Sequence, residues 1–272
     1  MTCKITVRFI VRKMEKIIHS VKALLCLFLL IAGCASEPIT TSSLYTPPHP
    51  SQLYRYLGFV PKGNGKPDMF AVIIGANTEH RHRGNISLAY QVLIEQSYKR
   101  QDIFILDTDD SGPFFPRIDV TSRDAVEVLL GYLKDTVEQD DTLLVYITGH
   151  GKRVNNQPSV VLNMGEMFRI SELIHQLSLI NPSKGFLFID HCYAGESVIP
   201  PNCQWNVVTV STDTTTSWAT SFPRLFWNAF RWGEETIEDA FWYAVEHDKG
   251  TRSGKNHPAL HKGNCANPSV GL

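Results

Sequence analysis

The chain has 272 residues, of which 43% are hydrophobic and 10% aromatic, and its formal net charge is −1. This length and composition suit one α/β domain of about 200 residues with additional segments. Without a surplus of basic residues, the chain has no electrostatic footprint for binding nucleic acid.

The first 33 residues are expected to form a signal peptide. Lys13, Lys16 and Lys22 precede an apolar run over residues 23–32, which is too short to span a bilayer and is followed by small residues. Met14 is an alternative start, because the segment that follows it is already a complete secretory signal. The pattern indicates export from the cytoplasm.

The stretch "LIAGC", residues 30–34, resembles the lipobox of bacterial lipoproteins. The resemblance implies cleavage before Cys34 and acylation of its thiol. Position 35 is not Asp, which favours the outer membrane, on the periplasmic face, in a diderm cell. The alternatives are an ordinary cleaved signal that contains a cysteine and, less favoured, a transmembrane anchor.

Residues 34–66 are rich in Ser, Thr and Pro and poor in charge near their start, so we expect a flexible tether. The folded body is expected over residues 67–262, with its first strand near Met69. Residues 263–272 are expected to form a C-terminal tail.

Short apolar runs bounded by turn or polar residues predict strands that are buried on both faces. Helical stretches alternate with them, the second opened by Thr121 or Ser122 as an N-cap, and a small hairpin is expected over residues 159–170. The predicted strands are 69–75, 102–107, 142–148, 185–190 and 205–211, and the predicted helices are 86–98, 122–138 and 170–179. This alternation predicts an α/β fold with a parallel sheet and right-handed crossovers.

Residues with reactive side chains follow two consecutive predicted strands. "LLVYITGHG" ends in His150 and Gly151, and "LFIDHC" ends in Cys192. Neighbouring strands lie about 4.8 Å apart, so a His and a Cys just beyond parallel strand ends can approach one another. A thiolate nucleophile, an imidazole that moves protons and backbone N–H groups beside small residues are the requirements of acyl transfer.

These blocks resemble the His-Gly and Cys blocks of the caspase-like cysteine peptidases, which include caspases, metacaspases, legumains and the transamidase of lipid-anchor attachment. The resemblance covers roughly residues 69–260. It implies a three-layer sandwich with a mostly parallel central sheet of about six strands. It also implies hydrolysis of a peptide or protein substrate without a metal or cofactor, and it defines no oligomeric state.

An earlier block, "VIIGANTEHRHRGNISLAYQVL", is similar to the first strand and helix of the legumain family. An Arg-His pair follows the strand in that family, and Ala-Tyr-Gln lies on the helix. Paired acids after the second strand also fit, here at positions 109 and 110. The matching residues are Arg81, His82, Ala89, Tyr90 and Gln91.

By this resemblance, His150 and Cys192 form a catalytic dyad, and the N–H groups of Gly151 and Cys192 form the oxyanion site. The implied substrate-binding residues are Arg81, His82, Asp190 and Ser211. An Arg opposite a carboxylate offers both donors and acceptors, which suits Asn at the substrate's P1 position.

The sequence departs from the legumain pattern at three points. Legumains carry Glu at position 190 and an acid at position 85, where this chain has Asp190 and Asn85, and "DHCYAG" is nearer the metacaspase version. A metacaspase-like preference for basic P1 residues therefore stays open, as does transamidation. Trp218 is a candidate apolar subsite, with packing over the sheet edge as the simpler interpretation.

The sequence gives weaker support to other functions. His257, His261 and Cys265 are spaced four apart, as zinc ligands can be, but Pro258 opposes a single helical face. No G-x-S-x-G elbow supports a serine hydrolase. A non-catalytic lipoprotein that binds peptides in its cleft is the remaining alternative.

The cysteines outside the signal region are Cys34, Cys192, Cys203 and Cys265. If Cys34 is acylated and Cys192 stays reduced, Cys203 and Cys265 remain as a possible disulfide in an oxidising periplasm. Two free buried thiols are the alternative.

Overall fold

The computed structural model describes residues 66–76, 79–107, 117–118, 121–195, 198–212, 216 and 221–263. All of them belong to the second of two compact units, Pro47–Leu272. The predicted signal peptide, Cys34 of the lipobox and residues 35–65 of the tether lie outside these residues and stay predictions. Among the helices described, none is long and apolar enough to cross a membrane.

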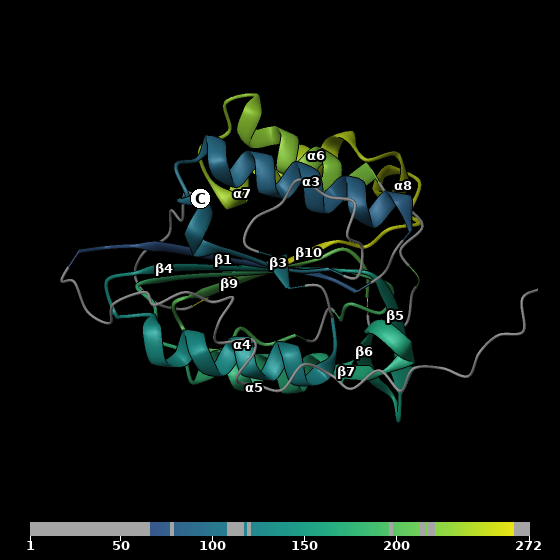
Figure 1. The fold of residues 1–272 in the computed structure, drawn as a ribbon. Helices are drawn as coiled ribbons and strands as arrows, with labels where there is room; N and C mark the ends of the chain where they lie inside the picture. Colours follow the sequence, from purple (N-terminus) through teal and green to yellow (C-terminus); the bar gives the residue numbers. More distant parts are fainter. Residues whose placement is uncertain are drawn as a thin grey trace, which may run out of the picture. The chain divides into compact units, whose positions relative to one another are not determined.

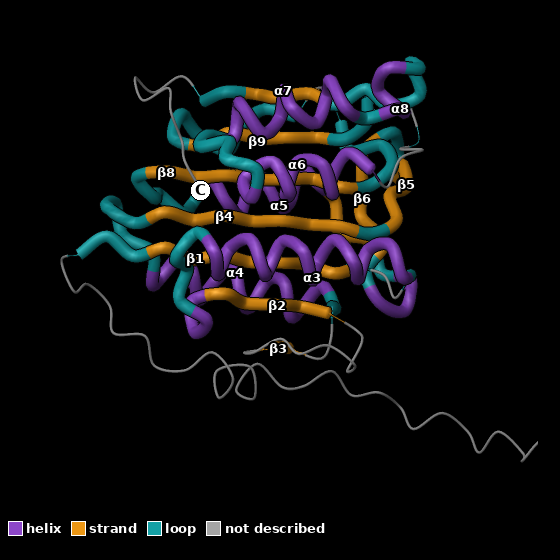
Figure 2. The backbone as a smooth tube through the Cα atoms, turned by 90° about the horizontal axis from the view of Figure 1, so that it is seen from above, coloured by secondary structure: helices purple, strands orange, loops and turns teal. Residues whose placement is uncertain are grey.

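The centre of the fold is a seven-stranded sheet in the order β10-β9-β8-β4-β1-β2-β3 (Figure 2). All neighbouring strands pair in parallel except β10, which is antiparallel to β9. The strands are β1 (Met69–Gly75), β2 (Ile103–Asp107), β3 (Arg117–Ile118), β4 (Thr142–Thr148), β8 (Lys184–Asp190), β9 (Trp205–Thr209) and β10 (Ala259–His261). The predicted α/β fold with a mostly parallel sheet is confirmed.

Helices cover both faces of this sheet (Figure 1). One layer contains α3 (His80–Glu95), α6 (Ser221–Arg231), α7 (Ile237–His247) and the short α8 (Lys249–Arg252). The other contains α4 (Arg123–Thr136) and α5 (Ile170–Ser178). Two single-turn 3₁₀ helices, η1 (Arg100–Asp102) and η2 (Asn163–Gly165), complete the connections.

Side chains of one strand supply two separate cores, which explains the continuous apolar runs. Phe70, Val72 and Ile74 of β1 join the core beneath α4 and α5. Ala71 and Ile73 point to the opposite face and join the core beneath α3, α6 and α7. Because successive side chains of a strand alternate between faces, a strand with a helix layer on each side must be apolar throughout.

The predicted helix boundaries hold closely for α4 and α5 but not for α3. Ser122 is the N-cap of α4, and its Oγ accepts a hydrogen bond from the Ala125 N–H at 3.1 Å. The prediction that the first helix begins at residue 86 is wrong, because α3 begins at His80. Its first six residues are polar or glycine, which hides the apolar period of a helix.

A second, three-stranded antiparallel sheet projects from the end of β4. It consists of β5 (His150–Val154), β6 (Gln157–Val161) and β7 (Met167–Arg169). The β5–β6 turn contains Asn155 and Asn156 with φ of 51° and 61°, the backbone that a two-residue type I′ turn requires. The predicted hairpin over residues 159–170 is thus part of a larger unit that begins at His150.

Candidate active site

The parallel pairing of β4 with β8 brings two predicted site segments together. Thr148 is opposite Asp190 in the register of the two strands. The next N–H along, from Gly149, donates to the Asp190 carbonyl at 3.2 Å. His150 and Cys192 each follow that pair by two residues, so both lie at the carboxyl edge of the sheet.

Gly151 shows how closely the two segments approach. A Cβ added at Gly151 would lie 1.7 Å from the carbonyl oxygen of Cys192 and 2.5 Å from Nδ1 of His191. Only a residue without a side chain fits in this position. The backbone that follows His150 is therefore packed directly on the backbone of Cys192, a half-buried cysteine that is not disulfide-bonded.

Cys192 lies in a tight turn that directly follows β8. His191 is buried, and its Nδ1 donates to the Cys192 carbonyl at 2.7 Å. Tyr193 has a φ of +58°, in the left-handed region that residues other than glycine seldom occupy. Burial lowers the pKa of His191 to about 4, so its imidazole is neutral near pH 7.

Ser211 lies beneath this turn and is fully buried. Its hydroxyl donates to the His191 carbonyl at 3.0 Å and accepts from the Ala194 N–H at 2.9 Å. The resemblance implied a wall of the substrate pocket, whereas the structure gives Ser211 contacts to the backbone on both sides of Cys192.

His150 has a partner that the sequence did not reveal. Its Nε2 lies 2.8 Å from Oε1 of Glu79, the residue that precedes α3. The other carboxylate oxygen of Glu79 accepts from Nε of Arg81 at 2.9 Å. Although desolvation opposes the change, the charges of His150 and Arg81 lower the pKa of Glu79. Glu79 is therefore an anion that holds His150 from the N-cap position of α3.

Asp190 is buried in a polar cluster below the sheet edge. Its Oδ2 accepts from the Tyr146 hydroxyl at 2.9 Å, from Thr148 Oγ1 at 2.7 Å and from Asn85 Nδ2 at 3.1 Å. Burial raises the pKa of Asp190, while the three donors oppose that rise. Asn85 explains one departure from the legumain pattern, because an amide there donates to Asp190, whereas an acid would face it with a like charge.

His82 extends the cluster toward His150. Its Nδ1 lies 2.6 Å from Thr148 Oγ1, and its ring meets that of His150 edge to face at 5.9 Å between centroids. Since the single Thr148 proton goes to Asp190, His82 must donate its Nδ1 proton to Thr148. Burial, followed by the charge of Arg81, lowers the pKa of His82 to about 4. His82 is thus a neutral, buried residue behind His150.

The structure does not bring Arg81 to Asp190. Among the described residues Arg81 pairs with Glu79, and the hydrogen bonds to the Asp190 carboxylate come from Tyr146, Thr148 and Asn85. The two side chains make no direct contact, and their predicted placement on opposite sides of one pocket stays a prediction. The carboxylate beside Arg81 is that of Glu79.

Several residues singled out in the sequence lie outside the part of the chain that the structure describes. Trp218 and the acids at 109 and 110 lie outside the described residues, as does Cys265. Cys203 is disulfide-bonded, and Gly263 packs on its carbonyl, two residues before Cys265. These observations agree with the predicted pair, which stays a prediction. No group of three His, Cys, Asp or Glu side chains in the described ranges is placed to hold a metal ion.

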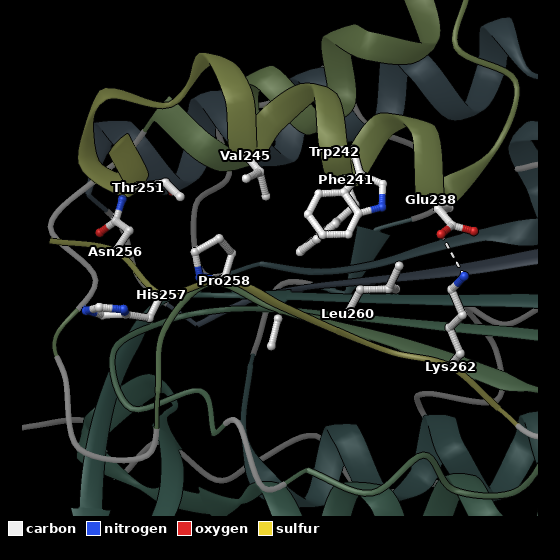
Figure 3. A pocket seen from close by; sticks show the side chains of 11 residues that line it. Glu238, Phe241, Trp242, Val245, Thr251, Asn256, His257, Pro258, Leu260 and Lys262 are labelled. Atoms are coloured by element: carbon white, nitrogen blue, oxygen red, sulfur yellow. Dashed lines mark ion pairs between the residues drawn. The ribbon is translucent and has the colours of Figure 1, made fainter. Parts of the chain in front are cut away.

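A groove of about 690 Å³ runs between α7 and the edge strand β10 (Figure 3). Phe241, Trp242 and Leu260 line its apolar part, and Lys262 pairs with Glu238 at one end at 2.6 Å. None of its lining residues belongs to the predicted dyad, oxyanion site or substrate-binding set. The groove is thus separate from the Cys192 turn.

No family model matches the sequence, and no curated protein matches it. Among solved structures, the chain is similar to the Drosophila initiator caspase Dronc, with a TM-score of 0.47 and 11% sequence identity. The alignment covers 72% of this chain and 79% of the caspase chain.

The close approach of Gly151 to Cys192 predicts that a side chain at position 151 destabilises the protein. In Gly151→Ala the new methyl group collides with backbone, so we expect a loss of about 1–3 kcal/mol in the free energy of unfolding, measured with urea. Gly131→Ala is the matched control, because no atom lies within 4 Å of that position in α4 and helix propensity favours Ala by about 1 kcal/mol. A Gly151→Ala protein as stable as the wild type would contradict the packing of these two segments.

The buried His82 makes a prediction about pH. Its pKa of about 4 lies below the ordinary 6.5, so the unfolded chain binds more protons between these values and stability is lost as pH falls from 6.5 to 4. A difference of this size corresponds to about 3 kcal/mol. His82→Asn keeps a donor for Thr148 but cannot titrate, so its free energy of unfolding should fall less over this interval than that of the wild type.

His175→Asn, at an exposed position on α5, is the control and should follow the wild type. Parallel pH curves for His82→Asn and wild type would show that His82 is not buried in its neutral form.

Proposed function

We propose that this chain is a cysteine endopeptidase of the caspase-like type, with Cys192 as nucleophile and His150 as its acid and base. The observation that carries the proposal is the packing of the His150–Gly151 backbone on the backbone of a reduced, half-buried Cys192. Both segments leave adjacent parallel strands at the same sheet edge. This arrangement supplies a thiol, an imidazole and backbone N–H groups within one small region.

The reaction follows from these groups. The Cys192 thiolate attacks the carbonyl carbon of the scissile bond, and the electron pair of the C=O bond moves to the oxygen. The N–H groups of Gly151 and Cys192 stabilise this oxyanion. Collapse of the intermediate expels the amine, which takes a proton from His150, and leaves an acyl group on the Cys192 sulfur. Water, deprotonated by His150, then releases the acid and restores the thiol.

Glu79 has a defined part in this mechanism. It engages Nε2 of His150, so proton exchange with the thiol uses Nδ1. A carboxylate on the distal nitrogen orients the ring and stabilises its protonated form. Glu79 thus favours the thiolate–imidazolium pair that attack requires.

We propose Asn as the favoured P1 residue. The Glu79 carboxylate contacts His150, and the half-buried Arg81 guanidinium pairs with Glu79, so together they offer an acceptor and donors to an amide. A basic P1 residue would need the carboxylate of Asp190, which is 5% exposed and already accepts three hydrogen bonds. The donors and acceptors of the described residues therefore support Asn over Lys or Arg.

The proposal includes a location. The lipobox at Cys34 and the tether over residues 34–66 support an enzyme held at the bacterial cell envelope by an N-terminal lipid, on the periplasmic face of the outer membrane in a diderm cell. Its substrates would then be peptides or proteins that reach that surface.

The function is tested with a peptide library varied at P1 and analysed by product mass. Wild-type protein should cleave after Asn, while Cys192→Ala and His150→Ala should lose at least about 1,000-fold in kcat/KM. Arg81→Ala should weaken cleavage after Asn selectively. Cleavage only after Lys or Arg would replace the P1 assignment, products joined to an amine would indicate transamidation, and peptide binding without turnover would indicate a receptor.

Glu79→Gln keeps the size and shape of the side chain but removes its negative charge. We expect kcat to fall about 10-fold or more, because the imidazolium form of His150 loses its partner. Thermal stability should be unchanged, since an exposed pair contributes at most about 1 kcal/mol. Glu127→Gln, which breaks the exposed pair with Arg123 on α4, is the control for kcat. Equal kcat values for Glu79→Gln and wild type would remove Glu79 from the mechanism.

A further inference from the structure

The peptide group that precedes Cys192 is fixed by one side chain. The Ser211 hydroxyl donates to the His191 carbonyl at 3.0 Å, and its oxygen accepts from the Ala194 N–H at 2.9 Å. One hydroxyl can make both bonds at once, because it has one proton and two lone pairs. In a trans peptide the N–H points opposite to the carbonyl, so Ser211 also sets the direction of the Cys192 N–H.

The peptide group that follows Cys192 is fixed by another side chain. Its carbonyl accepts from Nδ1 of His191 at 2.7 Å and is packed against Gly151. A carbonyl can only accept, so the proton of the neutral imidazole is on Nδ1. His191 is 2% exposed, so solvent does not compete for this bond.

The turn between these two anchors is not one that the chain would adopt by itself. Tyr193 has a φ of +58° and carries a full side chain. The left-handed conformation is unfavourable for a residue with a Cβ, because its Cβ approaches the following carbonyl oxygen. Bonds to the residues on either side of Tyr193 hold this conformation in place.

We propose that His191 and Ser211 are positioning residues that fix the two peptide groups flanking Cys192, and thereby aim its thiol and its N–H at one substrate carbonyl. The inference rests on the proposed function. Neither residue contacts the substrate or changes its protonation state during the reaction. Ser211 acts through the His191 carbonyl, and His191 acts through the Cys192 carbonyl.

Two reactions of the same thiol separate this role from a general effect on structure. Acylation of Cys192 by p-nitrophenyl acetate forms a C–S bond and an oxyanion, and then expels p-nitrophenolate. Alkylation by iodoacetamide forms a C–S bond and expels iodide without an oxyanion. Only the first reaction depends on the direction of the Cys192 N–H. Neither needs a peptide, so both can be measured whatever the substrate specificity.

The variants use the geometry of the imidazole. The amide nitrogen of His191→Asn takes about the position of Nδ1 and can donate to the Cys192 carbonyl, whereas that of His191→Gln corresponds to Nε2 and cannot. Ser211→Ala removes the other anchor. Ser122→Ala is the control, because it removes the cap of α4, which lowers stability, and leaves the Cys192 turn intact. Cys192→Ala in the full chain gives the background from other thiols.

We expect His191→Gln and Ser211→Ala to lose about 100-fold in the acylation rate, the usual effect of removing an oxyanion donor. His191→Asn should stay within about 10-fold of wild type by the same measure, and alkylation should stay within about threefold in every variant. In peptide hydrolysis, kcat should follow acylation while KM is unchanged.

Acylation and alkylation that fall in parallel, equal losses in the Asn and Gln variants, or no acylation in the wild type would each overturn the inference. A wild-type protein that is acylated at Cys192 but cleaves no peptide would instead overturn the proposed function. The acylation rates of the variants would then still test whether His191 and Ser211 position Cys192.

Discussion

The hydrogen bond from the Gly149 N–H to the Asp190 carbonyl is the constraint on which the site depends. It extends the pairing of β4 and β8 by one step beyond Thr148 and Asp190, just where both strands end. A shift of one residue in this register would exchange the faces of every side chain and would separate His150 from Cys192. The two apolar cores therefore stabilise the site indirectly, because they hold these strands in one register.

The polar residues below the edge follow from the same pairing. Tyr146 and Thr148 are two residues apart on β4, so their side chains share one face, and both donate to Asp190 on the neighbouring strand. Asn85 reaches the same carboxylate from α3. A buried acid is stable only when its lone pairs are satisfied. The cluster thus joins α3 to the strand ends, and α3 in turn carries Glu79 at its start.

Much of this fold follows from the sequence because local patterns determine it. The strands β1, β4 and β8 are unbroken apolar runs, and the Ser122 cap of α4 is a local signal. The start of α3, the strand β10 and the small β3 have no comparable pattern, since their side chains are polar or their runs are too short. Parallel strand ends also predict the approach of His150 to Cys192.

The contacts of Glu79 and Ser211 were not predictable in this way. Glu79 meets His150 across 71 positions in the chain, and Ser211 meets the His191 carbonyl across 20. Such contacts depend on which way a side chain turns at the sheet edge. A resemblance to a family supplies a position but not that direction, so it implies a pocket wall at Ser211 and a place opposite Asp190 for Arg81 without indicating the contacts that each side chain makes.

The two reactive residues are attached to different sheets. Cys192 directly follows a central strand of the main sheet, whereas His150 is the first residue of β5, where the chain passes into a small hairpin. β5 extends about 13 Å from His150 to Val154, so His150 is the residue at which the hairpin joins the end of β4. A displacement of the turn at Asn155 and Asn156 therefore reaches His150 along β5, and it reaches the Cys192 backbone only through the contact at Gly151. The stiffness of this hairpin thus governs how constant the separation between imidazole and thiol remains.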